Sequence, residues 1–136
     1  ILSGMNAMSQ LQDNLKTLAE PQALDAQEQA TLQKALRAYL KLSPIPCTAC
    51  NYCMPCPFEV DIPGNFRAYN ECAGKRLLDS IHEKDKREEF EKLWQTLEPE
   101  NLAHECKACG VCRSKCPQQI DIPERMLELK EMLQNI

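Results

Sequence analysis

The chain has 136 residues, with 16 basic and 20 acidic side chains and a formal net charge of −4. Proteins that bind nucleic acid through their charge carry a basic excess, so the composition argues against that class. No apolar run approaches the ~20 residues of a membrane span, and no basic-then-apolar segment marks a secretion signal. We therefore expect a cytoplasmic protein that contacts neither membrane nor nucleic acid. Because the first residue is Ile1 rather than Met, we expect the chain to be processed or cut from a longer one.

Helical periodicity predicts two helices in the first third of the chain. Residues 8–20 place Met8, Leu11, Leu15 and Leu18 on one face, and Pro21 ends that helix. Asp25 and Glu28 resemble a capping box, so a second helix is expected over about 26–42. Its apolar stripe consists of Leu32, Ala35, Leu36, Tyr39 and Leu40.

Three further helices are expected around and after the first cysteines. The third spans about 65–81, with Phe66, Tyr69, Ala73 and Leu77 facing inward. The fourth has a solvated, charged face over 83–92 and an apolar stripe of Phe90, Leu93, Trp94 and Leu97, and Pro99 closes it. The last runs over about 123–134, with Met126, Leu127, Leu129, Met132 and Leu133 as apolar positions. No alternating strand pattern appears, so the predicted class is all-α, with a strand remnant at the extreme N-terminus.

Nine cysteines dominate the composition. In a short chain they indicate either a disulfide scaffold or a metal site. The odd count, the missing secretion signal and the tight spacing all argue against disulfides.

Eight of the cysteines lie in two segments that repeat each other, CTACNYCMPCPFEVDIP at 47–63 and CKACGVCRSKCPQQIDIP at 106–123. Both contain C-x-A-C-x-x-C, then C-P, then D-I-P. The first three cysteines of the two runs are 59 positions apart, and the C-P cysteines, Cys56 and Cys116, are 60 apart because the second copy has one extra residue. The repeat predicts two similar halves related by a pseudo-twofold axis.

This spacing suits a 4Fe–4S cluster, which needs one thiolate on each of four irons. C-x-x-C-x-x-C brings three sulfurs together from one side, and in bacterial two-cluster ferredoxins the C-P cysteine ligates the other cluster. We therefore predict two 4Fe–4S clusters with crossed ligation, one held by Cys47, Cys50, Cys53 and Cys116, the other by Cys106, Cys109, Cys112 and Cys56. Two alternatives stay open: each run of four closes its own cluster, or the sites bind zinc, which usually takes separated Cys pairs or Cys with His.

Four residues near the repeat have simpler interpretations. Cys72 lies at the edge of the apolar face of its helix and is expected to be a small buried hydrophobe, with a ligand or redox-thiol role as the alternative. Asp61 and Asp121 are expected to be helix N-caps, the latter with Glu124 three residues on. His104 is expected to be a surface or packing residue, with a hydrogen bond to a cluster sulfur as the alternative.

The cysteine spacing, with about fifty residues between the two sets, resembles the α-helical dicluster ferredoxin fold, which also occurs in iron–sulfur subunits of succinate dehydrogenase-type and heterodisulfide reductase-type enzymes. The segment PCTACNYCMPCPFEVDIPGNFRAYNE resembles the C-terminal iron–sulfur extension of certain bacterial aldo/keto reductases. In that family the position of Glu59 is often a small residue such as Gly.

The N-terminal segment ILSGMNAMSQLQDNL is similar to the last strand, loop and helix of the aldo/keto reductase barrel. The resemblance implies that this loop helps bind NADP(H) in the full-length parent, through Ser3, Gly4, Asn6, Gln10 and Asn14. It also implies a division into a barrel remnant (1–22), a connecting helix (23–46) and a dicluster ferredoxin domain (47–136). The catalytic Tyr, Lys, Asp and His of the barrel have no counterpart here, so this chain is not expected to reduce a carbonyl by itself, and its status as an enzyme stays open.

The sequence thus predicts an electron-transfer module that passes single electrons between a partner redox site and an external carrier. The partner implied by the resemblance is the missing reductase barrel. Two other functions stay open. The clusters could only stabilise a small helical domain, or the chain could be a zinc-binding interaction module.

Overall fold

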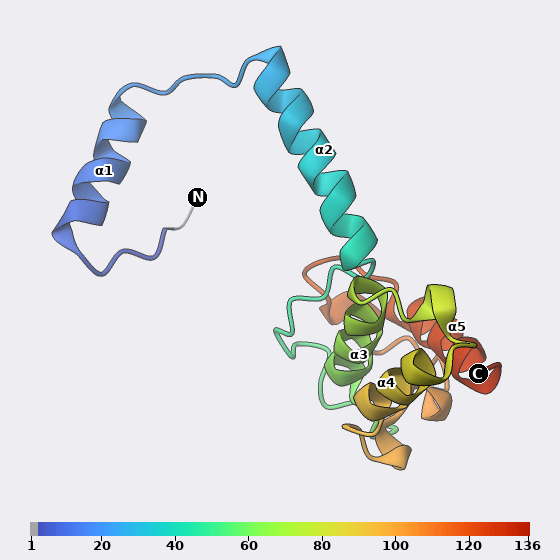
Figure 1. Ribbon diagram of the computed structural model, residues 1–136. Coiled ribbons are helices and arrows are strands. Elements are labelled where there is room, and N and C mark those ends of the chain that lie inside the picture. Colours follow the sequence, from blue (N-terminus) through green and yellow to red (C-terminus); the bar gives the residue numbers. More distant parts are fainter. Residues whose placement is uncertain (1–2) are drawn as a thin grey trace. The chain divides into compact units, whose positions relative to one another are not determined.

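The structure, a computed structural model, describes residues 3–136 and is helical, with no strand in that range. Its α-helices are α1 (Met8–Ala19), α2 (Ala26–Leu42), α3 (Ile62–Gly74), α4 (Lys84–Trp94) and α5 (Ile122–Gln134) (Figure 1). Short 3-10 turns lie between them: η1 (Leu78–Ser80), η2 (Pro99–Asn101), η3 (Ala103–Glu105) and η4 (Arg113–Lys115). The all-α class is confirmed. The expected N-terminal strand remnant falls partly on residues 1–2, which lie outside the described residues, and residues 3–7 precede α1 without forming a strand.

The chain divides into two compact units, Ile1–Ala35 and Leu36–Ile136. The bounds of α1 and α2 agree with the prediction to within a residue. The capping box of α2 forms as expected, because the Asp25 backbone N–H donates to Glu28 Oε2 (2.9 Å) and the Glu28 N–H donates to Asp25 Oδ1 (2.8 Å). None of the helices described is long and apolar enough to cross a membrane.

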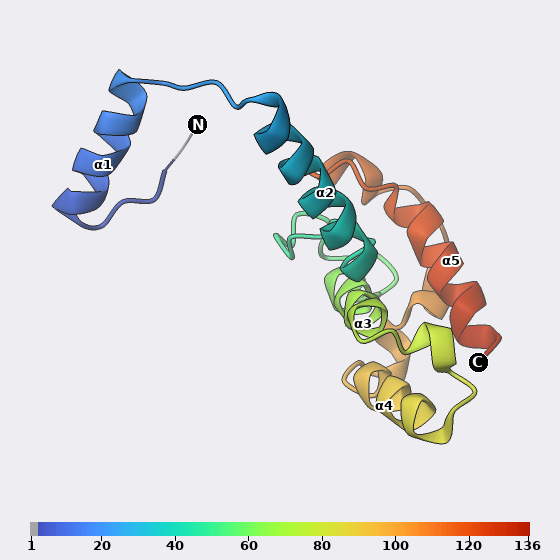
Figure 2. The ribbon, with the colours of Figure 1, turned by 45° about the horizontal axis from the view of Figure 1, so that its top comes forward.

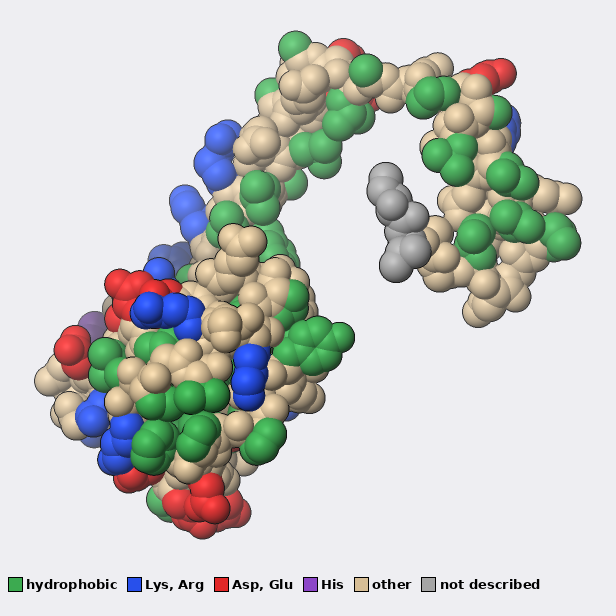
Figure 3. All heavy atoms as spheres, turned by 180° about the vertical axis from the view of Figure 1, so that it is seen from behind, with side chains coloured by type: hydrophobic (Ala, Val, Ile, Leu, Met, Phe, Trp, Pro, Cys, Tyr) green, Lys and Arg blue, Asp and Glu red, His purple; other side chains and the backbone are tan. Residues whose placement is uncertain are grey.

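The predicted apolar stripe of α2 is exposed. Leu32, Leu36, Tyr39 and Leu40 are all exposed, and Figure 3 shows hydrophobic side chains at the surface along this helix. The core of the second unit comes instead from α3, α4, α5 and the cysteine segments. In it α3 packs against α4 and α5, and α5 packs against η3 (Figure 2).

The deepest side chains of this core are Phe66 and Cys72 on α3, Ile122, Met126 and Leu129 on α5, and Val60 and Leu77 outside the helices. On α4, the rings of Phe90 and Trp94 pack with centroids 5.9 Å apart. The predicted stripes of α3, α4 and α5 thus supply most of the core. The predicted end of the fourth helix is wrong, because α4 ends at Trp94 and Leu97 is buried beyond it. Leu127 is the exception on α5, since 42% of it is exposed on the solvent side of the helix.

The predicted third helix, 65–81, is wrong at both ends. α3 begins three residues earlier, at Ile62, and ends at Gly74. A Schellman motif ends it: Arg76 adopts φ 55°, its N–H donates to Ala73 O (3.0 Å), and the Leu77 N–H donates to Cys72 O (2.9 Å). Leu77 lies beyond the helix but is still buried, as expected. The motif turns the chain so that Leu77 joins the same buried core as Cys72.

The two D-I-P segments start α3 and α5 in the same way. Asp61 accepts the Gly64 N–H (3.0 Å) and Asp121 accepts the Glu124 N–H (3.3 Å), which confirms both residues as N-caps. Each aspartate is also the central residue of an inverse γ-turn, in which the N–H of Ile62 or Ile122 donates to the carbonyl two residues back (3.0 and 2.8 Å). At Gly64 a Cβ atom would collide with the side chains of Asp61 and Leu97, so a larger residue there would require both to shift. α5 carries Glu124 at the equivalent position.

Candidate metal centre

The eight repeated cysteines line two cavities. The first cavity is lined by Cys47, Cys50, Cys53 and Cys116, and the second by Cys53, Cys56, Cys106, Cys109 and Cys112. Each cavity therefore combines the three closely spaced cysteines of one run with the C-P cysteine of the other run. This is the grouping that crossed ligation requires, and the opposite grouping is not seen, since Cys56 does not line the first cavity and Cys116 does not line the second. Which cysteine binds which cluster stays a prediction.

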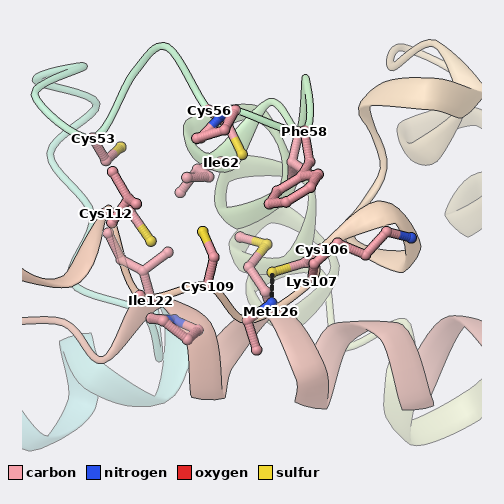
Figure 4. Close-up of a pocket in the computed structure, with 16 residues that line it drawn as sticks. Cys53, Cys56, Phe58, Ile62, Cys106, Lys107, Cys109, Cys112, Ile122 and Met126 are labelled. Atoms are coloured by element: carbon pink, nitrogen blue, oxygen red, sulfur yellow. Dashed lines mark hydrogen bonds between the residues drawn. The ribbon is translucent and has the colours of Figure 1, made fainter.

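Figure 4 shows how the second cavity is built. Cys56, from the loop before α3, points its sulfur toward the space into which Cys109, Cys112 and Cys106 also direct theirs. Phe58 and the Met126 side chain of α5 close one side. A backbone N–H reaches one of the sulfurs, because Ala108 donates to Cys106 Sγ at 3.4 Å. Most of the other side chains that line this space are apolar.

The two cavities share a wall. Cys53, Ile62 and Ile122 line both of them. Ile62 and Ile122 are the isoleucines of the two D-I-P segments and are each 2% exposed. The repeated motif thus places one buried isoleucine from each half between the two sites, which keeps the sites adjacent and the space between them dry.

The backbone repeats along with the cysteines. Ala49 and Asn51 in the first run, and Ala108 and Gly110 in the second, all have positive φ, between 51° and 81°. Glu59 and Gln119, three residues after the C-P cysteines, also match, with φ of 60° and 55°. Each of these two donates its N–H to the carbonyl of its C-P cysteine (3.1 Å in both). Left-handed backbone favours glycine, yet this chain carries Glu59 and Gln119 at these two positions.

Burial controls the protonation of several of these thiols. It raises the pKa of Cys112 to about 11, and it raises the pKa of Cys47 and Cys53 above their ordinary value. The Ala49 backbone N–H opposes this effect at Cys47. Protonated thiols do not ligate iron, so cluster binding at these sites must release protons, and the iron supplies the positive charge that keeps the thiolates ionised.

The donor set fits a polynuclear cluster better than a single ion. A structural zinc site needs its ligands to converge on one point, and within residues 3–136 no three Cys, His, Asp or Glu side chains converge in this way. Thiolates spread around a dry cavity suit a 4Fe–4S cluster, in which each iron takes its own thiolate.

An ion pair ties the second cysteine run to α5. Arg113, one residue after Cys112, donates to the Asp121 carboxylate at 2.8 Å. This guanidinium and the Glu124 N–H hold the pKa of Asp121 below its usual value. The N-cap of α5 therefore also anchors the loop that runs from Cys112 to Cys116.

The remaining predicted residues lie away from the cavities. Cys72 is fully buried, burial raises its pKa to about 11, and it lines neither cavity, which confirms it as a buried apolar residue. His104 is partly exposed, with Nε2 3.1 Å from Glu105 Oε1. Sequence reasoning missed Asn65 and Asn70 on α3. The signal for Asn65 is a polar residue beside Phe66 on a face that is otherwise apolar.

The residues expected to bind NADP(H) form one group at the start of α1. Asn14 Nδ2 donates to Ser3 Oγ (3.2 Å), and Gln10 Oε1 accepts the Asn6 N–H (2.9 Å). Gly4 lies between these residues with open space around it. Their role toward a nucleotide stays a prediction.

The comparisons with known proteins agree with this site. The family model described as a 4Fe-4S dicluster domain matches residues 46–120, more than half of the chain. The match includes all eight cavity cysteines, which fit two 4Fe–4S clusters. No curated protein and no solved structure matches the chain closely enough to count as a relative.

Proposed function

Because the chain belongs to the 4Fe-4S dicluster domain family, we propose that it is an electron-transfer module that passes single electrons through two adjacent clusters. When bound, the clusters accept and release one electron at a time. The observation that carries the proposal is the wall of Cys53, Ile62 and Ile122 shared by both cavities. It places the two sites next to each other.

Each of the two sites has one solvent-exposed cysteine that a redox partner could approach. Cys50 and Cys109 occupy equivalent positions in the two runs, and both are exposed, whereas the other six cavity cysteines are partly buried. The crossed grouping of the cysteines would leave one exposed ligand on each site. Electrons could therefore enter near one of these cysteines and leave near the other. No further redox centre is needed between the clusters and the protein surface.

The experiment is iron and sulfide analysis of anaerobically purified chain, followed by a potentiometric titration monitored by EPR. We expect about eight irons and eight sulfides per chain, because two cubane clusters contain that many, and two reversible one-electron reductions. Clusters that only stabilise the domain would be present but would resist reduction at physiological potentials. Zinc in place of iron in the anaerobic protein would favour the interaction-module alternative.

We further propose that the chain is the C-terminal part of an aldo/keto reductase-like, NADPH-linked oxidoreductase in the cytoplasm. Two features support this parent: the segment PCTACNYCMPCPFEVDIPGNFRAYNE, and the loop and helix of residues 3–14. The reductase barrel would be one partner and an external redox carrier the other. Genomic or transcript sequence upstream of Ile1 tests the parent directly.

Without the barrel, residues 3–14 should bind NADP(H) negligibly. A ligand held by one loop loses most of the enclosure that a small-molecule site provides, and the amides of Gln10 and Asn14 already bond within the segment. Calorimetry with NADPH should show no micromolar binding to this chain. Micromolar binding would mean that the loop is a complete nucleotide site.

A further inference from the structure

Two asparagines of α3 hold the segments that lead into the two cysteine runs. Asn70 Oδ1 accepts the Ile45 N–H (3.0 Å), and Asn70 Nδ2 donates to Ile45 O (2.7 Å). Asn65 Oδ1 accepts the Ala103 N–H (2.8 Å), and Asn65 Nδ2 donates to Asn101 O (2.9 Å). Ile45 lies two residues before Cys47 and Ala103 three residues before Cys106. Each run is therefore held at its start by one side-chain amide.

The held residue in turn binds the first cysteine of its run. Ile45 O accepts the Cys47 N–H at 2.7 Å, and Ala103 O accepts the Cys106 N–H at 3.1 Å. A short chain of hydrogen bonds thus connects each asparagine, through one residue, to the backbone of one cysteine.

From this arrangement we propose that Asn70 and Asn65 are positioning residues for two different clusters. Asn70 sets Cys47 at the first cavity, and Asn65 sets Cys106 at the second cavity. Neither asparagine is expected to touch iron, and each acts through the backbone of the segment that it holds.

The chemistry of the amide explains why asparagine stands at both positions. An amide side chain offers a donor and an acceptor in one fixed plane, close enough together to hold the N–H and C=O of one residue. Asn65 is fully buried, and it is the one buried polar side chain among the described residues. Burying a polar group costs free energy unless its partners are present, and here Oδ1 has one partner and Nδ2 has two, Asn101 O and Asp61 O (2.7 Å). Ile45 and Ala103 are themselves buried, so solvent does not reach their backbone groups while the asparagines are in place.

The position of the two asparagines along α3 explains how one helix serves both sites. Five residues of an α-helix turn through about 140° beyond a full turn. Asn65 and Asn70 therefore face different sides of α3, toward different cysteine segments. In the repeat, Arg125 and Lys130 of α5 stand 60 positions later. These side chains cannot accept a hydrogen bond, so α3 carries this role without a counterpart in α5.

Asn65 also links two segments that carry cysteines of different runs. Its Nδ2 holds Asp61 O, in the segment that follows Cys56, together with Asn101 O, in the segment that precedes Cys106. Asn101 strengthens this link, because its Nδ2 donates to Glu59 O (2.6 Å) and its carbonyl accepts the Asp61 N–H (2.9 Å). Cys56 and Cys106 line the same cavity. Asn65 is therefore placed to fix the position of Cys56 relative to Cys106.

The test uses the full chain with its clusters and compares Asn70→Ala with Asn65→Ala. Cys47→Ser and Cys106→Ser first assign each EPR signal to a cluster, and this assignment holds whether or not ligation is crossed. We expect Asn70→Ala to change the EPR signal and potential of the Cys47 cluster only, and Asn65→Ala those of the Cys106 cluster only. Iron release from the affected cluster to a chelator should be at least about fivefold faster, the size expected for one lost hydrogen bond.

Two further variants complete the test, one as a control and one as a replacement for Asn65→Ala. Arg67→Ala, at an exposed position between the two asparagines, should leave both signals unchanged. If Asn65→Ala does not fold, Asn65→Ser replaces it, because the shorter hydroxyl stays polar but cannot hold both the Ala103 N–H and Asn101 O. Equal changes in both clusters, or no change in either, would overturn the proposal. The inference rests on cluster binding and not on electron transfer, so irreversible reduction of the wild-type chain would contradict only the proposed function.

Discussion

Ala49 and Ala108 adopt the same left-handed backbone conformation, with φ of 52° and 51°, although they lie in different cysteine runs. Each is the alanine of a C-x-A-C segment. The Ala108 N–H donates to Cys106 Sγ, and the Ala49 N–H partly offsets the rise that burial causes in the pKa of Cys47. The alanines thus turn the chain so that a backbone donor faces a sulfur, and a small side chain limits the strain.

This geometry predicts opposite effects of two substitutions at one position. Ala108→Gly should be tolerated, because glycine adopts positive φ without strain. Ala108→Val should destabilise the cluster-loaded chain by about 2 kcal/mol, since a β-branched residue is strongly disfavoured there. Anaerobic urea unfolding of both variants checks this. Equal stability of the two would mean that the left-handed turn is not required.

Crossed ligation predicts which cluster a C-P cysteine supports. Cys116→Ser should damage the cluster of Cys47, Cys50 and Cys53, because Cys116 lines their cavity and not the other. Iron content and the EPR signals of the two clusters measure the loss. Cys72→Ala is the control and should leave both clusters intact. Loss of only the Cys106 cluster in Cys116→Ser would support closure of each run on itself.

Local charge predicts that the cluster of Cys106, Cys109 and Cys112 has the higher potential. Reduction adds negative charge, so positive charge nearby favours the reduced form. Lys107 lines the second cavity, but its side chain is half exposed and its Nζ lies 3.4 Å from Glu105 Oε2, which weakens the effect. Lys107→Glu should lower this potential by roughly 20–60 mV. A titration in which neither centre shifts downward would contradict this expectation.

The ion pair between Lys75 and Glu89, 2.8 Å apart, predicts a pH-dependent contribution to stability. The hydrogen bond from Lys75 lowers the pKa of Glu89, and the same bond raises the pKa of Lys75. A lowered carboxyl pKa stabilises the fold above the unfolded value of about 4.3, and this contribution disappears as the pH falls through the folded value. Glu89→Gln should therefore be slightly less stable than wild type at pH 7 and equal to it in acid.

Urea midpoints of the two chains, measured in parallel from pH 7 downward, check this expectation. High salt should also close the gap, because both side chains are exposed to solvent. Glu88→Gln is the matched control, since Glu88 lies 3.9 Å from Lys84 and should contribute less. A gap between wild type and Glu89→Gln that does not depend on pH would mean that the loss comes from packing and not from charge.

The end of α3 offers a stabilising substitution. Arg76 occupies the left-handed position of the Schellman motif, where glycine is usual. Arg76→Gly should raise the free energy of unfolding by up to about 1 kcal/mol, because the relieved strain exceeds the added flexibility of the unfolded chain. Arg76→Ala removes the exposed ion pair with Asp79 but keeps the Cβ atom, so it should not stabilise. Thermal unfolding of the two variants distinguishes strain from charge.

The sequence alone determined the features that depend on neighbouring residues. Helix periodicity and capping patterns predicted the bounds of α2 and α5 and the N-cap roles of Asp61 and Asp121. The cysteine spacing predicted two cluster sites, because three ligands spaced three positions apart can converge within one short loop. These signals are local, since each depends on side chains a few positions apart.

The tertiary structure decided which distant segments meet. Cys116 lies beside the first run and Cys56 beside the second, yet these partners are 50 to 69 positions apart in sequence. α3 ends early because the backbone at Arg76 is left-handed, and an arginine does not indicate such a conformation in the sequence. Asn65 and Asn70 gained their roles because folding buries Ala103 and Ile45 against α3, where a backbone amide cut off from water must find a partner. No spacing pattern in the sequence predicts these hydrogen bonds, because the donors and acceptors come from separate parts of the chain.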